Sequence, residues 1–263
     1  MRVSPGAGLP ASDVTATEEP LEIRLGGQPF VVIMRTPGAD RDLATGFLLS
    51  EQIVRAPGEI STMRYCVDDD GRDTANVLNV WLSGDAAARA QVAITGRRHV
   101  TANSACGVCG RRSIDDLMEG SRRVESDLRV TRAVVSALPD TLRAVQRTFD
   151  ETGGLHAAGL FDAGGALLAM AEDVGRHNAV DKVHGAQLAA GHLPLSDRIL
   201  FVSGRTSFEI VQKAVVAGVP IVASVSAPSS LAVELAREAN VTLLGFVRGA
   251  TFNIYSGAER VMV

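Results

Sequence analysis

The chain of 263 residues has only three cysteines, and its first twenty residues contain no apolar stretch typical of a secretory signal. Those residues are rich in Ser, Thr, Pro, Gly and acidic side chains, so we expect a disordered tail over 1–20. No apolar run approaches the roughly 20 residues that cross a bilayer. The sequence therefore predicts a cytoplasmic protein without a membrane anchor, in a compartment where thiols stay reduced.

An excess of positive charge is also missing. The formal net charge is −4 and the sequence pI is about 5.8. These values argue against non-specific binding to nucleic acid or to anionic membranes. Hydrophobic residues make up 46% and charged residues 21% of the chain, which is enough to bury the core of one large or two small domains.

Two of the cysteines, Cys106 and Cys109, form a C-x-x-C motif with two arginines on each side. Nearby guanidinium groups stabilise the thiolate, which is the nucleophilic form of cysteine. Gly107 and Gly110 allow the backbone to wrap closely around both sulfurs. A short helix is expected over 113–119, and its dipole would favour negative charge at this loop. The segment therefore predicts sulfur chemistry.

Several kinds of site use such a cysteine pair. A structural zinc site needs four ligands, and no second C-x-x-C is present. A thioredoxin-like redox pair belongs at a strand-to-helix junction, whereas a basic loop precedes this motif. A structural disulfide does not suit a chain with three cysteines and no secretory signal. A nucleophilic or sulfur-carrying pair is the leading interpretation, with the zinc and redox sites left open. Cys66 is expected to be a buried hydrophobe.

The first part of the chain is predicted to be rich in strands. Residues 21–25 alternate with period two and precede Gly26 and Gly27, which predicts a hairpin with residues 30–34. Apolar residues at helical spacing predict a helix over 40–54, which Pro57 and Gly58 stop. Two further strands are expected at 60–67 and 77–82.

The second part alternates between strands and helices. The expected elements are a helix over 138–151, a hairpin of strands 157–161 and 166–171, a helix from about 178, strands 199–203, 221–225 and 241–247, and helices 207–217 and 229–238. Nearly continuous apolar strands joined by helices predict parallel β-α-β units with a sheet covered on both faces. We predict an α/β fold (α+β overall) with a strand-rich N-terminal domain over 21–130, which ends in the C-x-x-C loop, and an α/β domain over 131–263.

Polar loops follow the strands of this sheet, where ligands of open α/β sheets bind. The first loop holds Ser203 and Arg205, the second holds Ser229, and Arg248 and the segment 251–257 follow the last strand. Hydroxyls and free backbone N–H groups there suit a phosphate, with Arg205 as a bidentate clamp. The alternative is that these serines only cap helices. Neither a P-loop nor the usual dinucleotide motif is present.

A second polar segment covers residues 172–182. Asp173, His177 and Asp181 are four residues apart, so a helix covering all three would place them on one face. Such a face can orient the imidazole for proton transfer or ligand contact. The alternative is a capped, solvated helix start. The other histidines form no comparable local pattern.

Seven segments, taken in order, resemble the formate dehydrogenase accessory sulfurtransferase family. They are T-G-F-L-L-S-E at 45–51, C-G-V-C-G at 106–110, G-G-L-H-A-A at 153–158, E-D-V-G-R-H-N-A-V-D-K at 172–182, S-G-R at 203–205, S-A-P-S at 226–229 and G-F-V-R at 245–248. The resemblance runs from about residue 20 to the C-terminus. It also implies a cytidine deaminase-like α/β domain, although the zinc-binding deaminase signature is missing.

The resemblance implies a protein that takes persulfide sulfur from a cysteine desulfurase. The sulfur passes to the molybdenum or tungsten bis-guanine-dinucleotide cofactor that formate dehydrogenase requires. Cys106 matches the persulfide-carrying cysteine and Cys109 its partner. The segment matched to the cofactor consists of Phe252, Asn253, Ile254, Tyr255, Ser256 and Gly257. A guanine nucleotide is expected to mimic the cofactor, and no resident metal is expected. A homodimer is expected, and a cofactor-binding chaperone without sulfur chemistry is the alternative.

Overall fold

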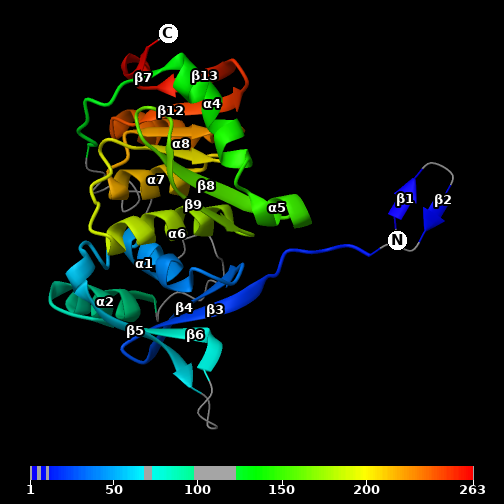
Figure 1. Ribbon diagram of the computed structural model, residues 1–263. Helices are drawn as coiled ribbons and strands as arrows, with labels where there is room; N and C mark the ends of the chain where they lie inside the picture. The colour runs from blue at the N-terminus through cyan, green and yellow to red at the C-terminus, as the bar shows by residue number, and fades with distance from the viewer. Residues whose placement is uncertain (1, 5–6, 10–11, 68–72, 98–122, 263) are drawn as a thin grey trace.

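The structure is a computed structural model that describes residues 2–4, 7–9, 12–67, 73–97 and 123–262. Cys106, Cys109 and the helix expected over 113–119 lie outside the described residues. Figure 1 shows a strand-rich first part and a larger α/β part, with helices α1 and α6 between their sheets. None of the helices in the described ranges is long and apolar enough to cross a membrane.

The first part contains a four-stranded sheet with the order β4-β3-β6-β5. Its strands are β3 (Glu19–Leu25), β4 (Gln28–Arg35), β5 (Ile60–Val67) and β6 (Asp73–Leu82). The predicted hairpin is confirmed, because β3 and β4 pair antiparallel across Gly26 and Gly27, which adopt φ angles of 56° and 86°. Helices α1 (Asp40–Ser50) and α2 (Asp85–Arg97) share one hydrophobic core with this sheet.

Two features of this part differ from expectation. Helix α1 ends at Ser50 because Gln52 turns into the left-handed region, with φ 57°, and Ile53 N donates to Leu48 O. Helix α2 has no counterpart among the expected elements. Its buried residues Ala86, Ala90 and Ile94 follow helical spacing, but two of them are alanines and so produce a weak hydrophobic signal.

The second part contains a six-stranded sheet with the order β13-β12-β11-β10-β8-β9. Its strands are β8 (His156–Phe161), β9 (Leu167–Asp173), β10 (Ile199–Val202), β11 (Ile221–Ser224), β12 (Thr242–Arg248) and β13 (Thr251–Ser256). Strands β10, β11 and β12 run parallel, whereas β8 and β13 are antiparallel to their neighbours β10 and β12. The predicted parallel units are therefore confirmed at the centre of a mixed sheet.

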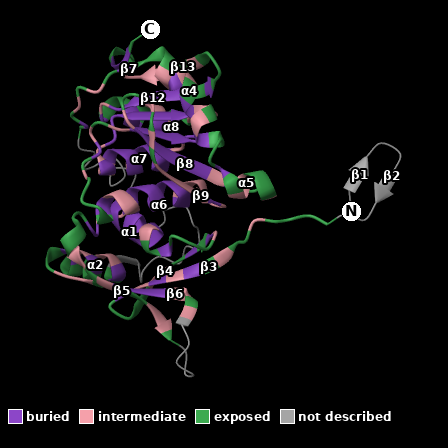
Figure 2. Cartoon of the chain, in the orientation of Figure 1, coloured by how far each residue is buried: buried purple, intermediate pink, exposed green. Residues whose placement is uncertain are grey.

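Helices cover both faces of this sheet. They are α4 (Arg132–Arg143), α5 (Arg147–Thr152), α6 (Arg176–Ala189), α7 (Phe208–Ala217) and α8 (Ser230–Glu238). Along β10, Leu200 and Val202 pack in the core of α6, α7 and α8, whereas Ile199 and Phe201 pack in the core of α4. Figure 2 shows the buried residues concentrated in this sheet and in α6. The layered α/β class is confirmed.

Other predictions in this part were less accurate. The single helix expected over 138–151 is two helices, α4 and α5, with a break at 144–146. Helix α4 begins earlier because Thr131 caps it, accepting a hydrogen bond from Val134 N at 3.3 Å. The segment 251–257 is largely a strand, β13, that returns along β12.

The chain ends carry short pairings. Strands β1 (Arg2–Ser4) and β2 (Ala7–Leu9) pair antiparallel within the expected disordered tail. Strands β7 (Val130–Thr131) and β14 (Val261–Met262) pair parallel, which ties the C-terminus to the start of α4. The domain boundary near residue 130 stays a prediction.

The two sheets are joined by close contact between α1 and α6. A Cβ atom added at Gly46 would lie 2.8 Å from Asp181 Cα and closer still to its carbonyl oxygen. One added at Gly185 would lie 2.7 Å from Gly46 N and closer still to Asp42 O. The two backbones touch at these glycines, so no side chain fits between them.

Candidate functional site at the carboxyl edge of the sheet

The polar loops predicted to bind a ligand lie side by side at the carboxyl edge of the larger sheet. Ser229 N donates to Thr206 O at 3.0 Å, and Thr206 N donates to Ala227 O at 3.3 Å. The loop after β10 is thereby joined to the loop after β11. Because β8 runs antiparallel to β10, its first residue, His156, lies at the same edge.

Two of the predicted serines have structural roles. The Ser229 hydroxyl accepts a hydrogen bond from Ala232 N at 3.2 Å and caps α8. The Ser203 hydroxyl accepts one from Ala157 N at 2.8 Å. Arg205, in the loop after β10, is exposed, so its guanidinium is accessible to a ligand. Among the predicted residues of the two loops, Arg205 has the chemistry and the exposure for direct phosphate contact.

Arg248 lies beside the second loop. Its Nε donates to Val225 O at 3.3 Å, and its side chain is exposed. Phe246 N donates to Ser226 O at 3.1 Å, so the end of β12 holds this loop in place. The structure therefore places a second exposed guanidinium at the same edge as Arg205.

The segment 252–257 is divided by the direction of β13. Phe252 and Ile254 pack in the core on the α4 side. Asn253 is exposed, and its amide donates to the Tyr255 hydroxyl at 3.4 Å. A Cβ atom at Gly245 would lie 3.0 Å from both Tyr255 Cε2 and Pro228 Cδ, so the Tyr255 ring borders the second loop. Tyr255 thus adjoins the predicted loop after β11, and the Asn253 amide lies beside its hydroxyl.

Ser256 and Gly257 lie at the other end of the sheet. The Ser256 hydroxyl donates to Val241 O at 2.7 Å, and Thr242 Oγ1 donates to Gly257 O at 2.8 Å. Both contacts are with the beginning of β12, because β13 has returned along its whole length. The structure does not bring these two residues to the carboxyl edge.

A cluster of basic side chains lies on the other flank of the loop after β10. It consists of His156 together with Arg176 and His177, which begin α6. A Cβ atom at Gly204 would lie 3.3 Å from His156 Nδ1 and 3.7 Å from Arg176 Cδ. Burial lowers the pKa of His156, and the charges of Arg176 and His177 lower it further. The sequence pattern did not identify His156, because only the antiparallel pairing of β8 brings it here.

His177 is paired at the start of α7. Its Nε2 lies 2.7 Å from Glu209 Oε2 and 3.1 Å from the Ser207 hydroxyl. Asp181 also faces α7, where it accepts from Lys213 Nζ at 2.7 Å and from the Ser50 hydroxyl at 2.8 Å. The expected single face of Asp173, His177 and Asp181 is wrong for Asp173, which ends β9 before α6 begins.

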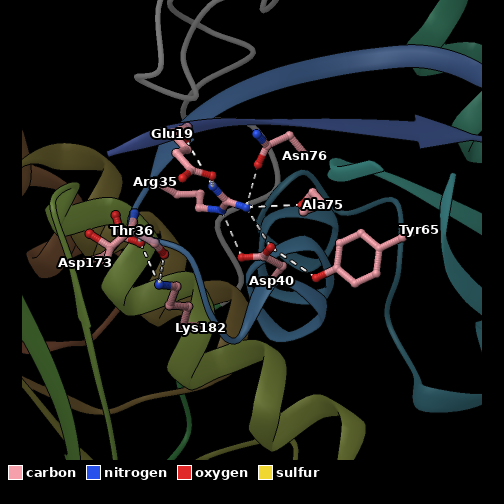
Figure 3. Close-up of polar contacts among 9 residues, drawn as sticks. All are labelled: Glu19, Arg35, Thr36, Asp40, Tyr65, Ala75, Asn76, Asp173 and Lys182. Carbon is pink, nitrogen blue, oxygen red and sulfur yellow. Dashed lines mark hydrogen bonds and ion pairs between the residues drawn. The ribbon is translucent and has the colours of Figure 1, made fainter. Parts of the chain in front are cut away.

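Asp173 is fully buried and organises the turn before α6 (Figure 3). Its carboxylate accepts from Lys182 Nζ at 2.7 Å, Gly175 N at 2.8 Å, Asn178 Nδ2 at 2.8 Å and Thr36 N at 3.2 Å. Lys182 Nζ also donates to Thr36 O at 2.9 Å. These bonds hold the first residues of α6 in place and connect them to the first part of the chain.

The residue before Thr36 belongs to a second buried network, also drawn in Figure 3. Arg35 donates to both carboxylate oxygens of Asp40, at 3.0 and 2.9 Å, and the Tyr65 hydroxyl donates to the same carboxylate at 3.1 Å. Burial and the Asp40 charge raise the pKa of Tyr65. The ordered strand end at Arg35 thereby positions Thr36 against Asp173.

No group of three or more His, Cys, Asp or Glu side chains able to hold a metal occurs among the described residues. Cys66 is partly exposed on β5, so the expectation of a fully buried side chain is wrong. Cys106 and Cys109, the pair predicted to be reactive, fall in the range 98–122, which the structure does not describe.

Comparison with known proteins gives consistent matches over the whole chain. The model of the FdhD/NarQ family matches residues 16–262. The "Sulfur carrier protein FdhD" of Nocardia farcinica is 51% identical over 265 residues, covering 99% of this chain and 92% of that protein. Its counterpart in Streptomyces avermitilis is 48% identical over 266 residues, covering 99% and 93%.

A solved structure supports the fold. A crystal structure of a Desulfotalea psychrophila protein, proposed to be a formate dehydrogenase accessory protein, matches with a TM-score of 0.77. The match covers 99% of this chain and 96% of that one, at 23% identity.

Proposed function

Because this chain belongs to the FdhD/NarQ family, we propose that it is a sulfur carrier that serves formate dehydrogenase. It takes persulfide sulfur from a cysteine desulfurase and transfers it to the molybdenum or tungsten bis-guanine-dinucleotide cofactor. The observation that carries the proposal is the match to relatives named sulfur carrier proteins, which covers 99% of this chain at 51% and 48% sequence identity. The proposed setting is the cytoplasm, and the proposed assembly is a homodimer.

Cys106 performs the proposed sulfur transfer. Its thiolate attacks the terminal sulfur of the donor's cysteine persulfide, a new S–S bond forms, and the donor cysteine leaves as a thiolate. Cys106 then carries the sulfur as a persulfide. When the outer sulfur passes to the cofactor, the S–S bond breaks and its electron pair stays on the Cys106 thiolate. The sulfur leaves at the zero-valent level, and two electrons from the metal of the cofactor substrate would reduce it to a sulfido ligand. Four nearby arginines, two before and two after the motif, favour both anionic forms of this cysteine. Cys109 resolves or shields the persulfide.

The carboxyl edge of the larger sheet is the proposed cofactor site. Arg205 and Arg248 are exposed there, Tyr255 borders the loop after β11, and the Asn253 amide bonds the Tyr255 hydroxyl. Guanidinium groups bind phosphate through paired hydrogen bonds, and the Tyr255 ring and the Asn253 amide suit a nucleotide base. We therefore expect guanosine diphosphate to bind as a mimic of the cofactor, and more tightly than adenosine diphosphate.

A single-turnover experiment tests the sulfur-carrying role. The protein is mixed with a persulfidated cysteine desulfurase and separated from it, and its intact mass is measured by mass spectrometry. We expect a mass increase of one sulfur atom, and its loss in Cys106→Ala but not in Cys66→Ala, which removes the cysteine outside the motif. If Cys106→Ala gains sulfur as the wild type does, the sulfur-carrier proposal is wrong.

The alternative is a chaperone that binds and delivers the cofactor without sulfur chemistry. It is separated from the proposed function by activation of formate dehydrogenase in cells that lack the endogenous protein. The sulfur carrier requires Cys106, so Cys106→Ala should give inactive enzyme while still binding guanosine diphosphate. Full activation by Cys106→Ala would favour the chaperone.

A further inference from the structure

Arg176 is a partly buried cation without a counter-charge. Its Nε is buried and has no hydrogen-bond partner, and it forms no ion pair with any residue that the structure describes. The acidic residues nearest in the chain have other partners. Asp173 pairs with Lys182, Asp181 pairs with Lys213, and Glu172 accepts from Phe149 N. A buried hydrogen-bond donor without a partner is costly, so the Arg176 Nε lacks the acceptor that its surroundings require.

The position of Arg176 in its helix adds to this imbalance. It is the first residue of α6, a helix of 14 residues, and the first turn contains no acidic side chain. The N-terminus of a helix carries partial positive charge, so a cation there is unfavourable and an anion is favourable. The helix and the guanidinium therefore attract the same anion.

The neighbouring residues His156 and Thr206 also have side-chain polar groups without a hydrogen-bond partner among the described residues. The His156 ring lies against Gly204 and the stem of Arg176, and no hydrogen bond to the ring is found among the described residues. Thr206, in the same turn as Gly204, is fully buried, and its hydroxyl has no partner within the described part of the chain. Two buried polar atoms, Arg176 Nε at the start of α6 and Thr206 Oγ1 on the turn after β10, thus have no partner among the described residues.

We infer that Arg176 and His156, together with the turn at Gly204, form an oxyanion subsite that binds a phosphate group. It lies on the flank of the loop after β10 away from Arg248, so the two flanks offer separate positions for two phosphate groups. This inference deepens the proposed function and rests on it for the identity of the ligand. The phosphate chemistry itself rests on the described residues.

Calorimetry with inorganic pyrophosphate and with guanosine diphosphate tests the subsite. Arg176→Gln should weaken pyrophosphate binding by about tenfold or more, as the loss of a charge-assisted hydrogen bond predicts. The matched control is Arg132→Gln, because Arg132 is also the first residue of a helix, α4, but is exposed. The control should bind pyrophosphate as the wild type does. Equal affinity of the two variants would overturn the inference.

A measurement on the wild-type protein needs no substitution. The imidazole of His156 is titrated by NMR with and without pyrophosphate, and the bound anion should raise its pKa, because a neighbouring negative charge favours the protonated ring. An unchanged pKa under saturating pyrophosphate would overturn the subsite. If pyrophosphate binds through Arg176 but guanosine diphosphate does not bind at all, the subsite stands and the proposed cofactor site is wrong. If guanosine diphosphate binds and Arg176→Gln changes the affinity for neither guanosine diphosphate nor pyrophosphate, the subsite is wrong and the proposed cofactor site stands.

Discussion

The contact between α1 and α6 allows a sharp test of the fold, through the substitution Gly46→Ala. Alanine in place of glycine within a helix normally stabilises it by roughly 1 kcal/mol, because glycine loses more backbone freedom on folding. A Cβ atom at Gly46 would lie 2.8 Å from Asp181 Cα, whereas carbon atoms in contact are about 3.5–4.0 Å apart. The helices must therefore separate by more than about 1 Å, because the Asp181 carbonyl oxygen lies closer still to the added atom. The neighbour is backbone, so no side chain can rotate away.

The free energy follows from that displacement. Gaps of about 0.5–1 Å remove a quarter to a half of the dispersion energy between the atoms concerned, and overpacking alone costs about 1–3 kcal/mol. The bonds from Ser50 and Lys213 to Asp181 cross the same contact and would also be strained. We expect Gly46→Ala to lower the free energy of unfolding by about 2–4 kcal/mol, more than offsetting the gain in helix propensity.

Urea denaturation of matched variants measures this change. Gly185→Ala should behave like Gly46→Ala, because its added Cβ atom would meet the backbone of α1. Gly58→Ala is the control, since a Cβ atom there meets nothing within 4 Å and the residue is exposed. The control should change stability by less than about 0.5 kcal/mol. A Gly46→Ala protein as stable as the wild type, or more stable, would refute the close contact.

Three further predictions concern buried polar groups. Burial lowers the pKa of His184 from 6.5 to about 3, so the unfolded state takes up the proton first and the free energy of unfolding falls as the pH drops from 6.5 towards 3. The loss is about 3 kcal/mol at pH 4.5. Denaturation at pH 7.5 and 4.5 should show this loss in the wild type and not in His184→Leu. Lys213→Met should cost about 3–5 kcal/mol by leaving Asp181 buried without its cation, and adding Asp181→Asn should recover much of the loss in urea denaturation. Ser229→Ala should lower the melting temperature by a loss of about 1 kcal/mol of helix capping, whereas a loss in nucleotide affinity at unchanged stability would show direct ligand contact.

Local sequence patterns predicted the elements whose causes are local. The hairpin of β3 and β4 follows from alternation and two glycines, and the parallel strands β10, β11 and β12 follow from apolar runs separated by helices. The break between α4 and α5 was missed, because a continuous helical pattern does not reveal where tertiary contacts end a helix. Helix α2 was missed because its buried face consists largely of alanine.

The parts of the candidate site that depend on local sequence were also predicted. The arginine-flanked C-x-x-C motif and the polar loops at strand ends depend on residue types and spacing, which are visible in the chain. Arg205 and Arg248 are exposed at the predicted edge for that reason. Cys106 and Cys109 stay a prediction, since they lie outside the described residues.

By itself, the sequence determined the sulfur chemistry to expect, the alternation of strands and helices, and the edge of the sheet where a ligand would bind. Only the tertiary structure decided which distant residues meet there. The antiparallel course of β8 brings His156 to Arg176, and that of β13 takes Ser256 and Gly257 away from the same edge. Strand direction depends on pairing between segments far apart in the chain, and period-two alternation is the same for either direction.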